Sequence, residues 1–229
     1  MKTVYAGIFF SIAVMLAATA LLTLKKKNRL SRAIRKVLLT AIVSAIATAC
    51  ISLSTSAEFC RIAYSIYSVS VGWGLLLLAH FCLLYTKQLY KLKLLKRVGI
   101  IALSLDSLAI LANCFFNNAF VIEQKVMANG DIFFLEVFTP QGKLHVALCF
   151  GLALASAIIL VIKIAKTPTI YWGKYLLALA FITFSTVWNI IFIIKDTPVN
   201  LSLVSFGIAG PLITYFSLFY RPRLIIDRM

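Results

Sequence analysis

Five side chains with polar or aromatic groups lie inside apolar stretches of the sequence, where such groups are the first candidates for binding chemistry. Asp106 comes first, because a carboxylate at the centre of a membrane helix costs about 2.5–3.5 kcal/mol on insertion scales. Asn113 follows seven residues later, on about the same helical face. Trp73, Trp188 and Asn189 lie in other apolar stretches. We predict that these five residues bind a small ligand, with packing inside the protein as the competing interpretation.

The sequence shows no pattern that is typical of an enzyme. It contains no paired carboxylates, no histidine and cysteine spacing for a metal, no phosphate-binding glycine loop and no nucleophile elbow. We therefore predict a non-enzymatic protein with no metal and no other cofactor. Cys60 and Cys114 fall near the same ends of two apolar stretches, so a disulfide and two free thiols both stay open.

Seven apolar stretches must position the candidate residues. Hydrophobic residues make up 62% of the 229-residue chain and charged residues 13%, whereas soluble domains average about 25% charged residues. Roughly 20 helical residues cross a bilayer, where every backbone polar group must be satisfied internally. We predict an all-α membrane protein with a single seven-helix transmembrane domain over residues 1–229, with spans at about 4–24, 37–55, 62–85, 98–116, 144–162, 175–194 and 199–220.

Basic residues gather on one side of these spans. Eighteen of the 23 Lys and Arg residues follow the first, third, fifth and seventh spans, and short cytoplasmic loops are rich in Lys and Arg. The pattern predicts a multi-pass plasma-membrane protein with its amino terminus outside and its carboxyl terminus in the cytoplasm. This orientation, with attraction to the lipid bilayer, explains the formal net charge of +16, so nucleic acid is not an expected partner.

A loop at 117–143, on the outer side, predicts a small β-hairpin between the fourth and fifth helices. Asn129-Gly130 separates two β-prone runs, and Asn-Gly is a strong hairpin signal. A two-residue loop would pair Val126 with Phe133 and Ile122 with Val137. Leu135 would share this apolar face, which would lie on the mouth of the helix bundle. Lys125, Glu123 and Glu136 would lie together on the opposite, polar face.

Two further patterns concern helix packing. In the second span, hydroxyl side chains recur every four residues beside alanines, which is typical of a close packing seam between membrane helices; they are Thr40, Ser44, Thr48 and Ser52. In the seventh span, Gly210-Pro211 predicts a loosened or kinked helix.

The layout resembles the amino-terminal seven-helix sensor region of bacterial histidine kinases and diguanylate cyclases. The resemblance lies in the outside-in topology and in the basic loop after the first span. It also lies in the outer segment ANGDIFFLEVFTPQGKLH (128–145) and in the carboxyl-terminal segment SLFYRPRLIIDRM (217–229). It implies a module that senses an extracellular or membrane-borne signal and relays it through the seventh helix to a cytoplasmic signalling protein or output domain. The chain ends where that domain would begin, so a fragment, a stand-alone sensor and a module with a separate partner all stay open.

We therefore expect a membrane receptor module for an unknown small ligand. One alternative is a small seven-helix solute transporter, which would combine two three-helix repeats around a linking helix. Against it, the first span lacks the proline of a paired Pro-Gln signature, although Pro140-Gln141 stands before the fifth. Another alternative is an assembly subunit without a ligand.

Overall fold

The structure of the chain is a computed structural model, which describes residues 1–88, 93–127, 130–169, 172–195, 197 and 199–219. Its long helices are α1 (Lys2–Thr23), α2 (Arg29–Leu53), α3 (Ala57–Tyr85), α4 (Lys93–Phe116), α5 (Pro140–Ala165), α6 (Trp172–Lys195) and α7 (Ser202–Thr214), which continues as a π-helical turn over Tyr215–Phe219. The strands β1 (Phe120–Val126) and β2 (Ile132–Phe138) stand between α4 and α5. Asn129 of the expected turn and the basic tail from residue 220 onward lie outside the described residues.

Seven helices in the described part of the chain are long and apolar enough to cross a membrane, and the chain is therefore a multi-pass membrane protein. The predicted seven-helix bundle with a hairpin is confirmed. Several helices begin before their apolar stretch because polar residues cap them. The side chain of Asn28 accepts the Ser31 N–H at the start of α2, and Thr139 accepts the Gly142 N–H at the start of α5, with Pro140 in the first turn.

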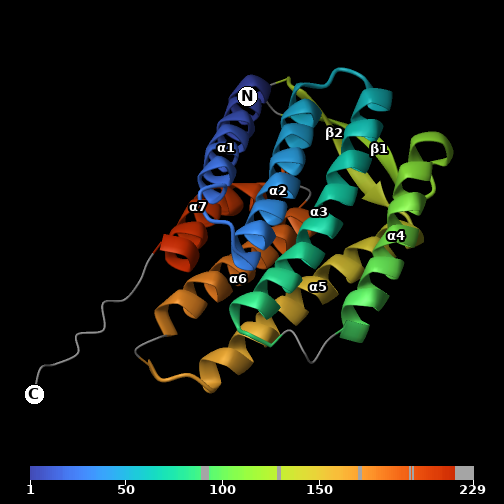
Figure 1. The fold of residues 1–229 in the computed structure, drawn as a ribbon. Coiled ribbons are helices and arrows are strands. Elements are labelled where there is room, and N and C mark those ends of the chain that lie inside the picture. The colour runs from blue at the N-terminus through green and yellow to red at the C-terminus, as the bar shows by residue number, and fades with distance from the viewer. Residues whose placement is uncertain (89–92, 128–129, 170–171, 196, 198, 220–229) are drawn as a thin grey trace, which may run out of the picture.

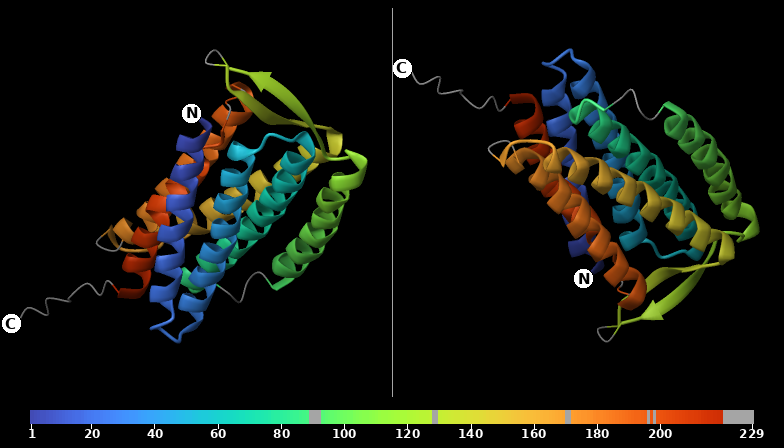
Figure 2. Two further views of the ribbon diagram at one scale, coloured as in Figure 1. Left: turned by 90° about the horizontal axis from the view of Figure 1, so that it is seen from above. Right: turned by 90° about the horizontal axis from the view of Figure 1, so that it is seen from below.

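Six helices form a closed ring in the order α1, α2, α3, α5, α6, α7, in which α7 packs against α1. Helix α4 lies outside this ring, against α3 (Figures 1 and 2). Within the ring, small residues allow close approach. A Cβ atom added to Gly210 of α7 would lie only 2.8 Å from Cδ2 of Leu16 in α1. The Oγ atoms of Ser44 and Ser70 are 2.7 Å apart, so part of the predicted seam on α2 packs against α3.

Helix α7 changes its winding near its end. Pro211 lies inside the helix and lacks the N–H that would bond to the carbonyl four residues earlier. The π-helical turn follows from Tyr215, and single π turns are local departures from regular helix geometry. The seventh span is therefore a continuous helix whose winding changes from α to π after Thr214, and the kink that the Gly-Pro pair predicts stays a prediction.

The hairpin covers the end of the bundle at which the chain begins (Figure 2). Its β1 and β2 strands are antiparallel, but the predicted register is wrong by one residue: Val126 pairs with Ile132 and Ile122 with Glu136. The Met127 N–H donates to the Asp131 carbonyl at 2.9 Å, which leaves three residues in the loop instead of two. Glycine at 130 suits this loop, because φ there is +81°.

The one-residue shift exchanges the faces of β2 relative to β1. Glu136 shares a face with Phe120 and Phe134, both of which are buried, instead of lying beside Glu123. The hydroxyl of Tyr64 in α3 donates to the carbonyl of Phe134 at 3.0 Å, which fixes the strand to the bundle. The hairpin therefore directs a carboxyl group toward the helices.

Candidate functional site

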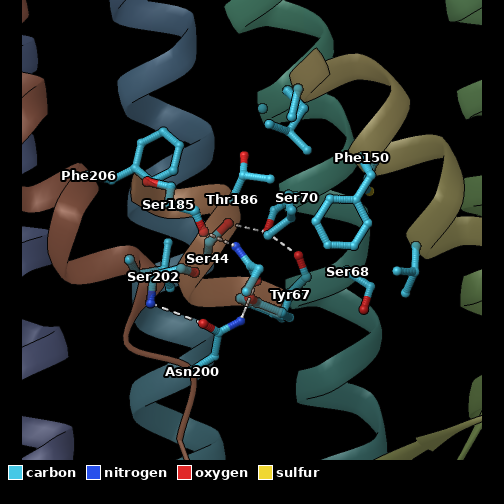
Figure 3. Close-up of a pocket in the computed structure, with 18 of the residues that line it drawn as sticks. Ser44, Tyr67, Ser68, Ser70, Phe150, Ser185, Thr186, Asn200, Ser202 and Phe206 are labelled. Atoms are coloured by element: carbon cyan, nitrogen blue, oxygen red, sulfur yellow. Dashed lines mark hydrogen bonds between the residues drawn. The ribbon is translucent and has the colours of Figure 1, made fainter. Parts of the chain in front are cut away.

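A cavity of about 130 Å³ lies inside the ring, beneath β2. We call it the central cavity. Its wall is mostly apolar and includes the rings of Phe138, Phe150, Phe192 and Phe206. Figure 3 shows Phe150 and Phe206 on opposite sides of a group of hydroxyl and amide side chains. The polar lining residues are Thr40, Ser44, Tyr67, Ser68, Ser70, Glu136, His145, Ser185, Thr186, Asn189, Asn200 and Ser202. A mostly apolar surface with polar side chains set into it is typical of small-molecule sites.

Glu136 brings an acidic group to the central cavity from the hairpin. Its Oε2 atom is buried and has no hydrogen-bond partner among the described residues. Burial raises the pKa of this carboxyl from 4.5 to about 8, and the nearby positive charge of His145 partly opposes the rise. Desolvation disfavours the charged form of a carboxyl group. Glu136 is therefore placed to change its protonation state near neutral pH.

His145 lines the same cavity and joins two helices. Its Nδ1 atom lies 2.7 Å from Oδ2 of Asp106 in α4, so the N–H at this nitrogen donates to the carboxylate. Its Nε2 atom lies 3.6 Å from Sγ of Cys149, one turn further along α5. Both members of the His145–Asp106 pair are largely buried, with 6% and 14% of their side chains exposed. The pair connects the outlying α4 to the wall of the cavity.

Asn200, just before α7, connects three helices at the cavity. Its side-chain N–H groups donate to the hydroxyl of Tyr67 in α3 at 3.0 Å and to Oδ1 of Asn189 in α6 at 2.7 Å. Its Oδ1 accepts the N–H of Ser202 in the first turn of α7 at 3.0 Å. Both donors of the amide are used, and Figure 3 labels Asn200 with its partners Tyr67 and Ser202. The start of α7 is therefore bonded directly to the cavity wall.

The structure brings the predicted site residues to different places. Asn189 lines the central cavity. Asp106 does not line it but holds His145, which does. Asn113 is fully buried at the end of α4, where its Oδ1 accepts the N–H groups of Ala119 and Phe120 and so holds the start of β1.

The two predicted tryptophans lie outside the set of residues that line the cavity. The indole N–H of Trp73 in α3 donates to Oγ of Ser107 in α4 at 2.9 Å. Trp188 stacks on the exposed ring of Phe184, with ring centroids 6.1 Å apart, on its own helix. Trp73 therefore attaches α4 to the ring, and Trp188 packs along α6.

Sequence reasoning missed His145, Asn200 and Tyr67, and it placed Glu136 on the wrong face. Each of the first three is a polar residue in an apolar span, which is a signal of an inward position. Such a signal does not say which residues of different helices meet. All five cysteines, each within the described residues, are free thiols, so the possible Cys60–Cys114 disulfide is absent.

The fold and the cavity define a class of protein: a multi-pass helical membrane protein with a polar group of side chains in a central cavity under a hairpin. No model of a known protein family matches the chain, and no curated protein matches it in sequence.

Proposed function

We propose that the chain is a membrane sensor module in which a small ligand binds in the central cavity and changes the position of α7. The change would pass along α7 to a cytoplasmic partner or output domain, as the resemblance to kinase and cyclase sensor regions implies. One observation supports this most: a single cavity is bordered by Glu136 and Phe138 of the hairpin and by Ser202 and Phe206 of α7.

The contacts of α7 connect it both to the cavity and to α1. Its first turn is bonded to Asn200, and its middle packs against α1 through Gly207 and Gly210. Its last part contains Pro211 and changes from α- to π-helical winding at Tyr215. A ligand shifts a conformational equilibrium only when it binds the two arrangements with different affinity. A molecule between the hairpin and Phe206 meets this condition whenever α7 moves relative to β2.

The orientation is also part of the proposal. The hairpin would face the outside, and the basic loops would face the cytoplasm of a plasma-membrane protein. The distribution of Lys and Arg supports this, since the basic segments follow α1, α3 and α5 and so lie at the end of the bundle away from the hairpin.

A methyl group already present in the chain can test the coupling. The Cε methyl of Met15 in α1 packs against α7 at Gly207, 3.4 Å from the position that a Cβ atom would take there. The chain has four methionines, so ¹³C-methyl spectra in lipid nanodiscs would be simple. Met15→Leu assigns its signal. We expect a small amphiphile that raises the thermal stability of the protein to shift the Met15 signal as well.

Two results would contradict the proposal. The first is a ligand that stabilises the protein and whose binding is lost when cavity residues are substituted, but that leaves the Met15 signal unchanged. This result would show binding without movement of α7. Accumulation of that ligand inside proteoliposomes that contain the protein, but not in protein-free vesicles, would show a transporter instead of a sensor.

A further inference from the structure

We propose that the central cavity takes a small organic monocation: an ammonium group held by Glu136, on an apolar chain of about five carbon atoms. This inference rests on the proposed function, because it names the ligand class of the sensor's cavity.

The charges at the cavity leave one negative charge unbalanced. Asp106 and His145 form an ion pair and neutralise each other when both are charged. Two uncharged side chains of α3, Tyr64 and Tyr67, also interact electrostatically with Glu136. No lysine or arginine is found among the described residues that line the cavity. An ionised Glu136 therefore matches a ligand with a single positive charge.

Hydrogen bonding selects a donor as the partner of Glu136. An ionised carboxylate only accepts hydrogen bonds, and burying it without a partner is costly. The Oε2 atom has no partner among the described residues. An ammonium group supplies up to three N–H donors and the balancing charge, whereas an alcohol supplies one donor and no charge. A carboxylate ligand would add a second negative charge beside Glu136.

The apolar wall of the cavity indicates the chemistry and the size of the rest of the ligand. Rings from four elements line the cavity: Phe138 of β2, Phe150 of α5, Phe192 of α6 and Phe206 of α7. Aromatic rings accept both alkyl chains and the polarised C–H groups next to an ammonium nitrogen. A cavity of about 130 Å³ is slightly smaller than an engineered cavity of about 150 Å³ that binds benzene, which has six heavy atoms. Pentylammonium, also with six heavy atoms, is the matching probe.

The test compares three ligands of one chain length: pentylammonium, 1-pentanol and pentanoate. Each is titrated into the full-length protein in detergent micelles, and the dissociation constant is taken from the concentration dependence of the melting temperature. We expect pentylammonium to bind best. Since protons compete for Glu136, its affinity should rise from pH 6 to pH 8 and then level off up to pH 9, where an alkylamine is still protonated.

Two glutamates of the hairpin give the variant and its control. Glu136→Gln keeps the shape of the side chain and removes its charge, so pentylammonium should bind about 10- to 100-fold more weakly, the range for losing a hydrogen bond to a charged group. Glu123→Gln makes the same change on β1, at an exposed residue that pairs with Leu135, and it should leave binding unchanged. Unaltered 1-pentanol binding in both variants shows that the cavity is intact.

The inference is overturned if pentylammonium binds no better than 1-pentanol, if pentanoate binds best, or if Glu136→Gln retains the wild-type affinity. A failure of the proposed function alone would give a different result. Pentylammonium would then bind, and its binding would depend on Glu136, but the Met15 methyl signal next to α7 would not shift.

Discussion

The carboxyl group of Glu136 permits a quantitative test of the position assigned to the hairpin. Its pKa rises from 4.5 to about 8 because the folded protein removes it from water, and each pKa unit corresponds to 1.36 kcal/mol. Ionising Glu136 in the folded protein therefore costs about 5 kcal/mol of folding free energy. The cost is absent below pH 4.5, where the carboxyl is protonated in both states. It grows as the pH rises and is complete above pH 8, because the folded state holds the proton that the unfolded state has released.

Glu136→Gln removes this dependence, since an amide does not titrate. The free energy of unfolding of the variant minus that of the wild type should therefore increase by about 5 kcal/mol between pH 4 and pH 9. Infrared spectroscopy gives a direct measurement: the wild type should show the C=O band of a protonated carboxylic acid that disappears with a midpoint near pH 8. The variant should lack this band. Glu123→Gln, on the exposed side of the hairpin, should keep both the band and the pH dependence.

A substitution of His145 provides an independent check on the pKa of Glu136. Its positive charge lowers the pKa of Glu136, so His145→Gln should move the midpoint of the infrared band to higher pH. A wild-type band that disappears near pH 4.5, or one that persists in Glu136→Gln, would mean that Glu136 faces water and that the register of the hairpin is wrong.

Three further predictions concern the contacts around the cavity. Asp106→Ala should lower the free energy of unfolding by about 3–5 kcal/mol, because it leaves the buried His145 without its carboxylate partner. Asp131→Ala, which removes a partly exposed partner of the amino terminus, should cost at most about 1 kcal/mol. Gly142→Ala should destabilise the hairpin by about 3 kcal/mol, since the new Cβ would overlap with the carbonyl oxygen of Ala119. Proteolysis of the hairpin measures this, and Gly151→Ala, where a new Cβ meets nothing within 4 Å, is the control. Asn200→Ala removes three hydrogen bonds and should cost about 1–3 kcal/mol in thermal unfolding and shift the Met15 methyl signal without any ligand.

Hydropathy and length were sufficient to predict the seven helices, because lipid leaves few alternatives to a helix. The hairpin was also predictable from its turn signal and flanking β-prone runs. Its register was not, because Asn-Gly is compatible with loops of two or three residues and only contacts with the bundle decide between them. Tyr64 makes such a contact with β2, from 70 residues away along the chain.

The cavity could not be predicted from the sequence, because it depends on the order of the helices in the ring, and hydropathy does not give this order. Asp106 was expected beside the ligand, but α4 lies outside the ring, and the carboxylate is connected to the cavity through His145. Asn113 was an equally reasonable candidate by depth, yet the backbone of the hairpin uses its carbonyl oxygen. A polar side chain in an apolar span thus indicates an inward position, and its partner is set by tertiary packing.

The register of the hairpin has a consequence for how this protein can be altered. Deleting a single loop residue would leave Met127 opposite Asp131 across a two-residue loop, so the pairing of the two strands would be kept. Deleting one residue of β2 between the loop and Glu136 would instead pair Glu136 with Glu123 on the outward face of the sheet, because side chains alternate along a strand. An apolar neighbour would then replace the acidic group in the central cavity. The length of β2, and not that of the loop, would therefore select between charged and neutral ligands, without any substitution in the helices.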